Sequence, residues 1–226
     1  MEILRYLSFA ISPIIALMIY LFLRYRFPGG SFNLLFRSFL WGMASIVLVL
    51  VVQLLAHVFH LDHLNSIRRI AFYSLVVTAF FSEFSKFFFL KVFCYPRENF
   101  KSPVDGIIYS VMIAMGFATM NSILYFLNIP NLKVNTVNLV TAGPANVIFG
   151  VMMGFFIGLG KIRKIRLIDS MTGLSAAVFF HALYSFCLLT KDYKLLAALF
   201  IGSVIIVISL VLASLKITAE APAKGT

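Results

Sequence analysis

Three ionisable side chains lie inside long apolar stretches of the sequence: Glu83, Lys86 and His181. An ionisable group in hydrocarbon is costly unless it is paired or hydrated, so each of these residues is a candidate for a functional role. A buried carboxylate can act as a general base, and an imidazole can donate or accept a proton. Glu83 and Lys86 are three residues apart and therefore share one face of a helix, where they can pair. A salt bridge that only locks the helix is the alternative interpretation.

The composition places these residues in a membrane protein. Of the 226 residues, 62% are hydrophobic and 12% are charged, whereas soluble domains have about 45–50% and about 25%. A helix needs about 20 apolar residues to cross a bilayer. The sequence therefore predicts an all-α bundle in a single integral membrane domain, residues 1–226, with about seven transmembrane helices near residues 6–23, 38–59, 70–93, 105–127, 137–159, 168–190 and 195–215.

The basic residues sit in short clusters between the apolar runs, which is where positive charge orients a membrane protein. The net charge of +11 is therefore assigned to contact with the lipid bilayer and not to nucleic acid. The loops after the first, third, fifth and seventh runs hold twice as many Lys and Arg as the other loops. The positive-inside rule then predicts a multi-pass cell-membrane protein with its N-terminus outside and its C-terminus cytoplasmic. The first run resembles a signal peptide but has no small-x-small cleavage site, so we expect it to be retained.

Uncharged polar residues accompany the ionisable ones. Ser82 precedes Glu83, while Asn121 and Asn146 lie within two other apolar runs. In the predicted orientation, Glu83, Asn146 and His181 lie at similar depths near mid-membrane, and Asn121 lies slightly further toward the outside. We therefore expect four helices to converge on one polar site.

Small residues recur every fourth position in two of the runs. Gly150, Gly154 and Gly158 form one ladder, and Ala114, Ala118 and Ser122 form another. Such faces let helix backbones approach closely in lipid, so close helix packing is expected, with a substrate groove as the alternative. The two cysteines, Cys94 and Cys187, indicate neither a disulfide framework nor a metal motif.

Five short motifs appear in order along the chain. They are Ser82-Glu83-Phe84-Ser85-Lys86, Asp105-Gly106-Ile107-Ile108-Tyr109, Gly116-Phe117-Ala118-Thr119-Met120-Asn121-Ser122-Ile123-Leu124-Tyr125, Pro144-Ala145-Asn146-Val147-Ile148-Phe149-Gly150 and His181-Ala182-Leu183-Tyr184-Ser185-Phe186. Over residues 80–190 the sequence resembles the PrsW family of intramembrane proteases, which is related to the CAAX prenyl endopeptidases. The family pattern is Glu-Glu-x-x-Lys, Asp-Gly-Ile-x-Tyr, Gly-Phe-Ala-x-x-Glu-Asn-x-x-Tyr, Pro-x-His-x-x-Phe-Gly and His-Gly-Leu-Tyr-Asp-Phe. Five ordered motifs with matching spacing are far more specific than any one of them.

The resemblance implies an intramembrane endopeptidase that acts on a single-span, membrane-anchored regulatory protein. Its catalytic pair would be Glu83 and His181, with Ser82, Lys86, Asn121 and Asn146 in the pocket. The chain departs from the pattern at three of these positions, because Ser82 and Asn121 replace glutamates and Asn146 replaces a histidine. A hydroxyl and a neutral amide cannot act as general bases at neutral pH.

The same three replacements also reduce the number of residues that could bind a metal ion. The family would activate water directly with its carboxylates or through a bound metal, and here only Glu83 and His181 remain as strong zinc ligands. We therefore expect no metal, and no cofactor is firmly implied. Zinc held by Glu83 and His181 is the weakly supported alternative. An inactive pseudoprotease that binds a transmembrane partner is one alternative. A small transporter is another, because buried Glu, Lys and His also form proton relays.

Two further groups lie at helix ends. His57, His60, Asp62 and His63 cluster at the outer end of the second run, where they form either a zinc site or a set of interfacial side chains. Asp105 lies at the start of the fourth run, where a carboxylate favours a helix N-terminus.

Overall fold

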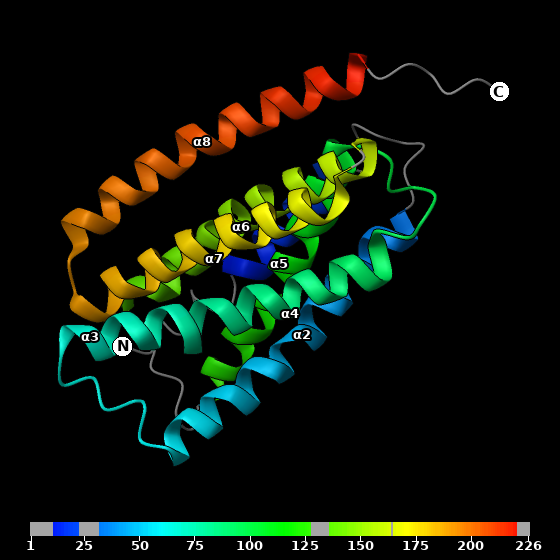
Figure 1. Ribbon diagram of the computed structural model, residues 1–226. Coiled ribbons are helices and arrows are strands. Elements are labelled where there is room, and N and C mark those ends of the chain that lie inside the picture. The colour runs from blue at the N-terminus through cyan, green and yellow to red at the C-terminus, as the bar shows by residue number, and fades with distance from the viewer. Residues whose placement is uncertain (1–10, 23–31, 128–135, 164, 221–226) are drawn as a thin grey trace.

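The computed structural model describes residues 11–22, 32–127, 136–163 and 165–220. Within these ranges the chain is helical and contains no strand. A first helix, Ile11–Phe22, is followed by the elements labelled in Figure 1. These are α2 (Phe32–Val58), α3 (Ile67–Phe72), η1 (Tyr73–Phe80), α4 (Phe81–Phe89), η2 (Leu90–Cys94), α5 (Pro103–Phe126), α6 (Thr136–Ile162), α7 (Arg166–Thr190) and α8 (Tyr193–Glu220). The predicted all-α polytopic bundle is confirmed.

A helix covers each predicted apolar run within the described residues. Five helices are long and apolar enough to cross a membrane: α2, α5, α7, α8 and residues Val140–Ile162 of α6. α2 begins six residues earlier than the predicted run, and α8 continues five residues beyond it. Residues 6–10 and 23 of the first run lie outside the described residues.

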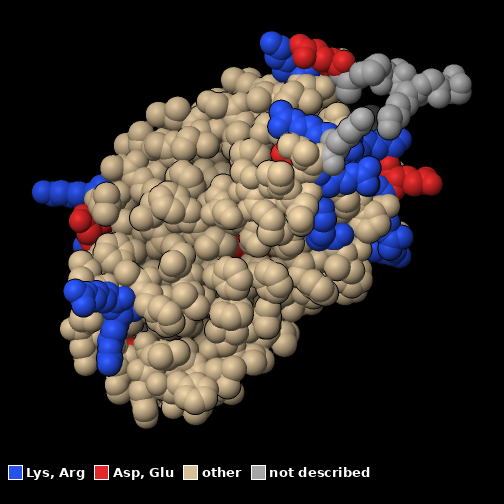
Figure 2. All heavy atoms as spheres, in the orientation of Figure 1, with Lys and Arg blue, Asp and Glu red and all other residues tan. Residues whose placement is uncertain are grey.

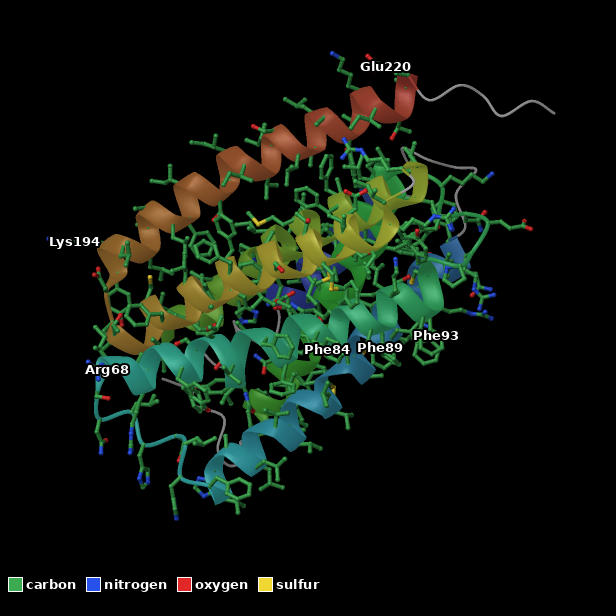
Figure 3. The ribbon with its side chains drawn as sticks, viewed as in Figure 1. Arg68, Phe84, Phe89, Phe93, Lys194 and Glu220 are labelled. Carbon is green, nitrogen blue, oxygen red and sulfur yellow. The ribbon has the colours of Figure 1, made fainter. Side chains whose placement is uncertain are left out.

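The third run forms one composite rod from residue 67 to residue 94. It consists of α3, η1, α4 and η2 in succession, and η1 and η2 are π-helical. Wider π turns are uncommon and change the direction in which the following side chains point. Glu83 and Lys86 lie in the regular α-helical part between the two π segments. Figure 3 shows Phe84, Phe89 and Phe93 along one side of this rod.

The bundle is organised around α5 and α6, which are its most buried helices. A Cβ atom added to Gly154 would lie 2.3 Å from the carbonyl oxygen of Gly106, and one added to Gly158 would lie 2.5 Å from the Cα atom of Pro103. No side chain fits in these gaps, so the glycine ladder brings the two backbones into direct contact. The expectation of close helix packing is confirmed.

The start of α5 is fixed by its own sequence. The Ser102 hydroxyl accepts the backbone N–H of Asp105 at 3.3 Å, and Asp105 Oδ2 accepts the backbone N–H of Ser102 at 2.9 Å. With Pro103 in the first turn, this is a complete capping box. Asp105 therefore caps α5, as its position predicts.

The surface separates into charged ends and an apolar middle. Figure 2 shows Lys and Arg gathered toward the two ends, with a broad uncharged belt between them. α8 is largely exposed along this belt and lies on the outside of the bundle (Figure 1). Arg68 and Lys194 lie at one end of the molecule and Glu220 at the other (Figure 3). This is the charge distribution of a protein whose middle contacts lipid.

Candidate functional site

A buried polar network joins three helices at the centre of the bundle. Glu83 of α4 is fully buried, and its Oε1 atom lies 2.6 Å from Lys86 Nζ and 2.6 Å from His181 Nδ1 of α7. Lys86 Nζ also donates to Asn146 Oδ1 of α6 at 2.9 Å. The pairing of Glu83 with Lys86 that the i,i+3 spacing indicates is therefore present. The network also brings Asn146 and His181 to the same point, as their predicted depths suggest.

His181 is held in place from two sides. Its ring stacks on Phe149 of α6, with a centroid separation of 4.8 Å and an interplanar angle of 12°. Because the Glu83 carboxylate accepts a hydrogen bond from Nδ1, the proton of a neutral ring is assigned to Nδ1 and the lone pair to Nε2. Nε2 has no hydrogen-bond partner within the described part of the chain. The arrangement orients an imidazole with one free basic nitrogen.

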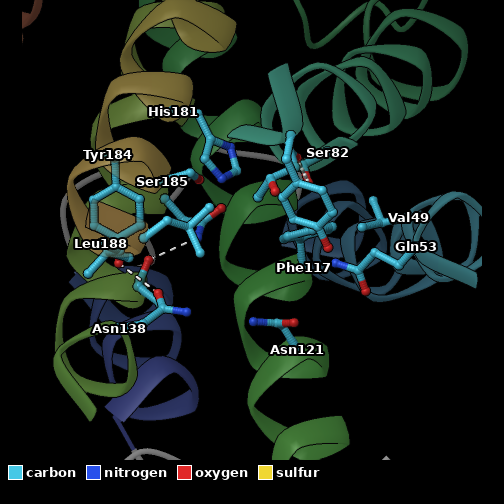
Figure 4. Close-up of a pocket in the computed structure, with 15 residues that line it drawn as sticks. Val49, Gln53, Ser82, Phe117, Asn121, Asn138, His181, Tyr184, Ser185 and Leu188 are labelled. Carbon is cyan, nitrogen blue, oxygen red and sulfur yellow. Dashed lines mark hydrogen bonds between the residues drawn. The ribbon is translucent and has the colours of Figure 1, made fainter. Parts of the chain in front are cut away.

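A cavity of about 130 Å³ lies beside this network. Figure 4 shows it between α2, the composite rod and α5 on one side and α6 and α7 on the other. Its polar lining residues are Gln53, Tyr73, Thr78, Ser82, Asn121, Asn138, Asn146, His181, Tyr184 and Ser185. A cavity with this many polar groups can hold water.

The predicted site residues divide into two groups around the cavity. Ser82, Asn121, Asn146 and His181 line it, whereas Glu83 and Lys86 are not among its lining residues. Glu83 instead lies behind the wall, where it contacts His181 directly and Asn146 through Lys86. Of the ionisable residues singled out from the sequence, His181 is the one in position to contact a molecule in the cavity.

The neutral polar residues on the cavity wall differ in how many hydrogen bonds they already make within the protein. Asn146 donates to the Ala142 carbonyl at 2.9 Å and accepts from Lys86, while the Ser82 hydroxyl donates to the Thr78 carbonyl at 2.5 Å. Asn121 makes no hydrogen bond to any other described residue, and Figure 4 shows its amide beside the open space. Asn121 is therefore free to bind a ligand.

Sequence reasoning missed a second polar cluster on the same wall. The Tyr184 hydroxyl donates to Asn138 Oδ1 at 2.7 Å (Figure 4). It also lies 2.8 Å from Thr141 Oγ1. The signal was present in the sequence, because Tyr184 lies one helical turn after His181, and Asn138 and Thr141 share a face of an apolar run. Gln53 of α2, a lone amide in an apolar run, was missed in the same way.

The histidine cluster after α2 does not form a metal site. His57 Nδ1 lies 3.2 Å from Asp62 Oδ2, and the rings of His60 and His63 stack with their centroids 5.2 Å apart. No group of three or more His, Cys, Asp or Glu that could hold a metal ion exists among the described residues. The interfacial interpretation of this cluster therefore fits its geometry.

Comparison with known proteins identifies the family of the chain. Residues 30–213 match the family described as "PrsW family intramembrane metalloprotease". Relatives named "Protease PrsW" include those of Geobacillus kaustophilus (27% identity, covering 82% of this chain and 80% of the relative), Bacillus subtilis (28%, 80% and 82%) and Halalkalibacterium halodurans (30%, 81% and 83%). No solved structure matches the chain.

The family match covers the composite rod and the helices α5, α6 and α7 that build the cavity. Together with the apolar helices and the uncharged belt, it makes this an integral membrane protein. The chain belongs to the PrsW family of intramembrane proteases.

Proposed function

We propose that this protein is an intramembrane endopeptidase that hydrolyses a peptide bond of a single-span, membrane-anchored protein. The observation that carries the proposal is the 2.6 Å contact between Glu83 Oε1 and His181 Nδ1, with His181 on the wall of a polar cavity. The name of the relatives, Protease PrsW, supports the same class of reaction.

In the proposed reaction His181 is the general base, and Glu83 is a positioning residue. His181 Nε2 takes a proton from a water molecule in the cavity while the water oxygen attacks the peptide carbonyl carbon. The Glu83 carboxylate stabilises the imidazolium that forms, through the bond to Nδ1. His181 then returns the proton to the leaving amine nitrogen as the C–N bond breaks. Asn121 has free amide N–H groups that can donate to the carbonyl oxygen as it becomes negative.

These roles differ from those suggested by the residue types alone. From the sequence alone Glu83 could serve as the base, because burial makes a carboxylate a better proton acceptor. A base must lie within hydrogen-bond reach of the water that it activates. Since His181 lines the cavity and Glu83 does not, His181 is the base in the proposed mechanism.

The family description implies a metal, so the donor set must be compared with what a metal requires. A catalytic zinc ion takes three protein ligands, usually His, Glu, Asp or Cys. Glu83 Oε2 is buried without a hydrogen-bond partner within the described residues, and His181 Nε2 is free, but no third ligand of these types lies with them. The residues present do not fit a catalytic metal. The mechanism proposed here therefore relies on the side chains alone.

The cavity reaches toward one end of the bundle. Gln53, Tyr73, Asn138 and Leu189 line it and lie close to the ends of α2, the composite rod, α6 and α7 that face the same side. In the proposed orientation, with the N-terminus outside and the C-terminus cytoplasmic, this is the outer side. A substrate would then enter from the outer half of the membrane.

A second function, binding without cleavage, is favoured by one observation. Lys86 places an ammonium group 2.6 Å from the carboxylate that would have to stabilise a positive imidazolium. This opposes the change in charge on which catalysis depends. The second candidate is therefore a pseudoprotease whose cavity retains a transmembrane partner.

The test uses the purified protein in detergent with a panel of single-span membrane proteins from the same organism. We expect cleavage by the wild type and a loss of about 100-fold or more in His181→Ala, because general-base catalysis typically contributes that much. His57→Ala, a histidine outside the cavity, is the matched control and should cleave normally. Equal cleavage by the wild type and His181→Ala would remove His181 from the mechanism. Stable co-purification of a panel member without any cleavage would instead favour the pseudoprotease.

A further inference from the structure

Behind the cavity wall lies a cation that belongs to the protein itself. Lys86 Nζ donates to Glu83 Oε1 at 2.6 Å and to Asn146 Oδ1 at 2.9 Å. It also lies 4.9 Å from the ring centroid of Phe117 and 5.9 Å from that of Phe149. A carboxylate, an amide oxygen and two aromatic faces are the groups that hold a cation in a dry site.

Three helices build this cage. The carboxylate comes from α4, the amide oxygen and one ring from α6, and the other ring from α5. Lys86 is almost completely buried, with 2% of its surface exposed. A lysine enclosed this thoroughly cannot move its amino group out to water, so the group stays beside Glu83, whose carboxylate is the counter-charge for the ammonium form.

The charges in the cage already balance. The Glu83 carboxylate and the Lys86 ammonium cancel, and His181 adds no charge while its ring is neutral. A divalent ion bound by Glu83 and His181 would lie next to this ammonium in a low-dielectric interior, where like charges repel strongly. The ion would also have to compete with the ammonium for Glu83.

We propose that this pocket holds no divalent metal, because Ser82, Asn121 and Asn146 replace two glutamates and a histidine of the family pattern and the Lys86 ammonium competes for the Glu83 carboxylate that remains. The chain is then a metal-independent member of a family described as metalloproteases. Lys86 supplies from within the protein the positive charge that keeps Glu83 ionised. This inference concerns the metal content of the pocket. It therefore holds whether the pocket cleaves a substrate, as proposed above, or only binds one.

The experiment measures bound zinc directly and needs no substrate. The wild type and the variants are purified in detergent, stripped of metal with EDTA and incubated with about a tenfold excess of Zn²⁺. Unbound zinc is then removed, because sites with three or four good ligands keep their zinc through this step. Bound zinc per chain is then measured by inductively coupled plasma mass spectrometry. His181→Ala reports zinc in the pocket, and the triple variant His57→Ala/His60→Ala/His63→Ala reports zinc on the exposed histidines.

We expect the wild type to hold less than about 0.1 zinc per chain in the pocket, because two strong ligands beside an ammonium are too few. Zinc that is lost in the triple variant and retained in His181→Ala lies outside the pocket and agrees with the proposal. Close to one zinc per wild-type chain that disappears in His181→Ala would overturn it.

A gain-of-binding variant tests the role of Lys86 itself. Lys86→Met/Asn146→His removes the ammonium and adds a third strong ligand at Asn146, which shares the Lys86 ammonium with Glu83. We expect this variant to bind close to one zinc and, with Co²⁺, to show the visible absorption of a tetrahedral site. Asn146→His alone, with Lys86 retained, should remain largely free of zinc. Tight zinc binding by the single variant would show that Lys86 does not prevent zinc from binding. If the double variant does not fold, the zinc content of the wild type still decides the proposal.

Discussion

Breaking the ion pair between Glu83 and Lys86 should strongly destabilise the protein, whereas removing both charges should cost less than the two single changes together. At the 2.6 Å separation of Oε1 and Nζ, and with an effective dielectric constant of about 20, the Coulomb attraction is about 6 kcal/mol. Much of this offsets the cost of taking both groups out of water, so the net contribution of the pair is far smaller.

Each single substitution leaves one buried charge without its partner, so the cost of removing that charge from water is no longer offset. Lys86→Met leaves the fully buried Glu83 carboxylate with only His181 as a partner, and we expect a loss of about 3–5 kcal/mol in the free energy of unfolding. Glu83→Gln keeps the acceptor for His181 but leaves the ammonium without a counter-charge, with a loss of similar size. In the double variant Glu83→Gln/Lys86→Met neither charge remains. We expect it to be less destabilised than the sum of the single variants by about 2–3 kcal/mol.

The assay is reversible unfolding in mixed micelles, in which increasing SDS is followed by circular dichroism. Lys91→Met is the matched control, because Lys91 lies on the same composite rod and donates to the Ser170 hydroxyl at 2.8 Å, with no carboxylate in its hydrogen bond. We expect this control to lose about 1 kcal/mol or less. If Lys86→Met is as stable as Lys91→Met, or if the two single effects simply add, the buried pair does not hold the site together.

Three further predictions follow from the contacts. Gly154→Ala should lose about 1–3 kcal/mol of unfolding free energy, because its Cβ would lie 2.3 Å from a backbone oxygen of α5. Gly202→Ala is the control, since no atom lies within 4 Å of its added Cβ. A change in unfolding free energy much above about 0.5 kcal/mol in this control would contradict the packing account. Tyr184→Phe should lose about 1–3 kcal/mol in the same unfolding assay, because it leaves a polar partner on α6 unsatisfied; wild-type stability would mean that water replaces the hydroxyl. Asn121→Leu should lower the cleavage rate by about 10- to 100-fold if its amide binds the oxyanion, and an unchanged rate in a peptide-cleavage assay would exclude that role.

The positions of the helices were predictable from the apolar runs because of a strict physical requirement. In hydrocarbon every backbone N–H and C=O group must be bonded within its own segment, so a long apolar run has little choice but to form a helix. The runs near residues 105–127 and 168–190 match α5 and α7 within two residues at either end. The two π-helical segments of the composite rod were not predicted, because their wider turns leave no mark on the pattern of apolar residues.

Local spacing also predicted part of the site. Glu83 and Lys86 are three residues apart on one helix, and their pairing follows from helix geometry without knowledge of the fold. The capping role of Asp105 has the same origin. The glycine ladder on α6 predicted a close helix contact, but it did not identify α5 as the partner.

What the sequence by itself determined about this protein is its class: an α-helical membrane bundle with a small set of polar residues at its centre, in the order and spacing of a protease family. Only the tertiary structure decided which of those residues face the cavity. Sequence gives the depth of a residue in the membrane, but the direction of its side chain depends on how the helices rotate and pack against one another. That rotation places His181 on the cavity wall, Glu83 behind it, and the Lys86 ammonium between Glu83 and Asn146.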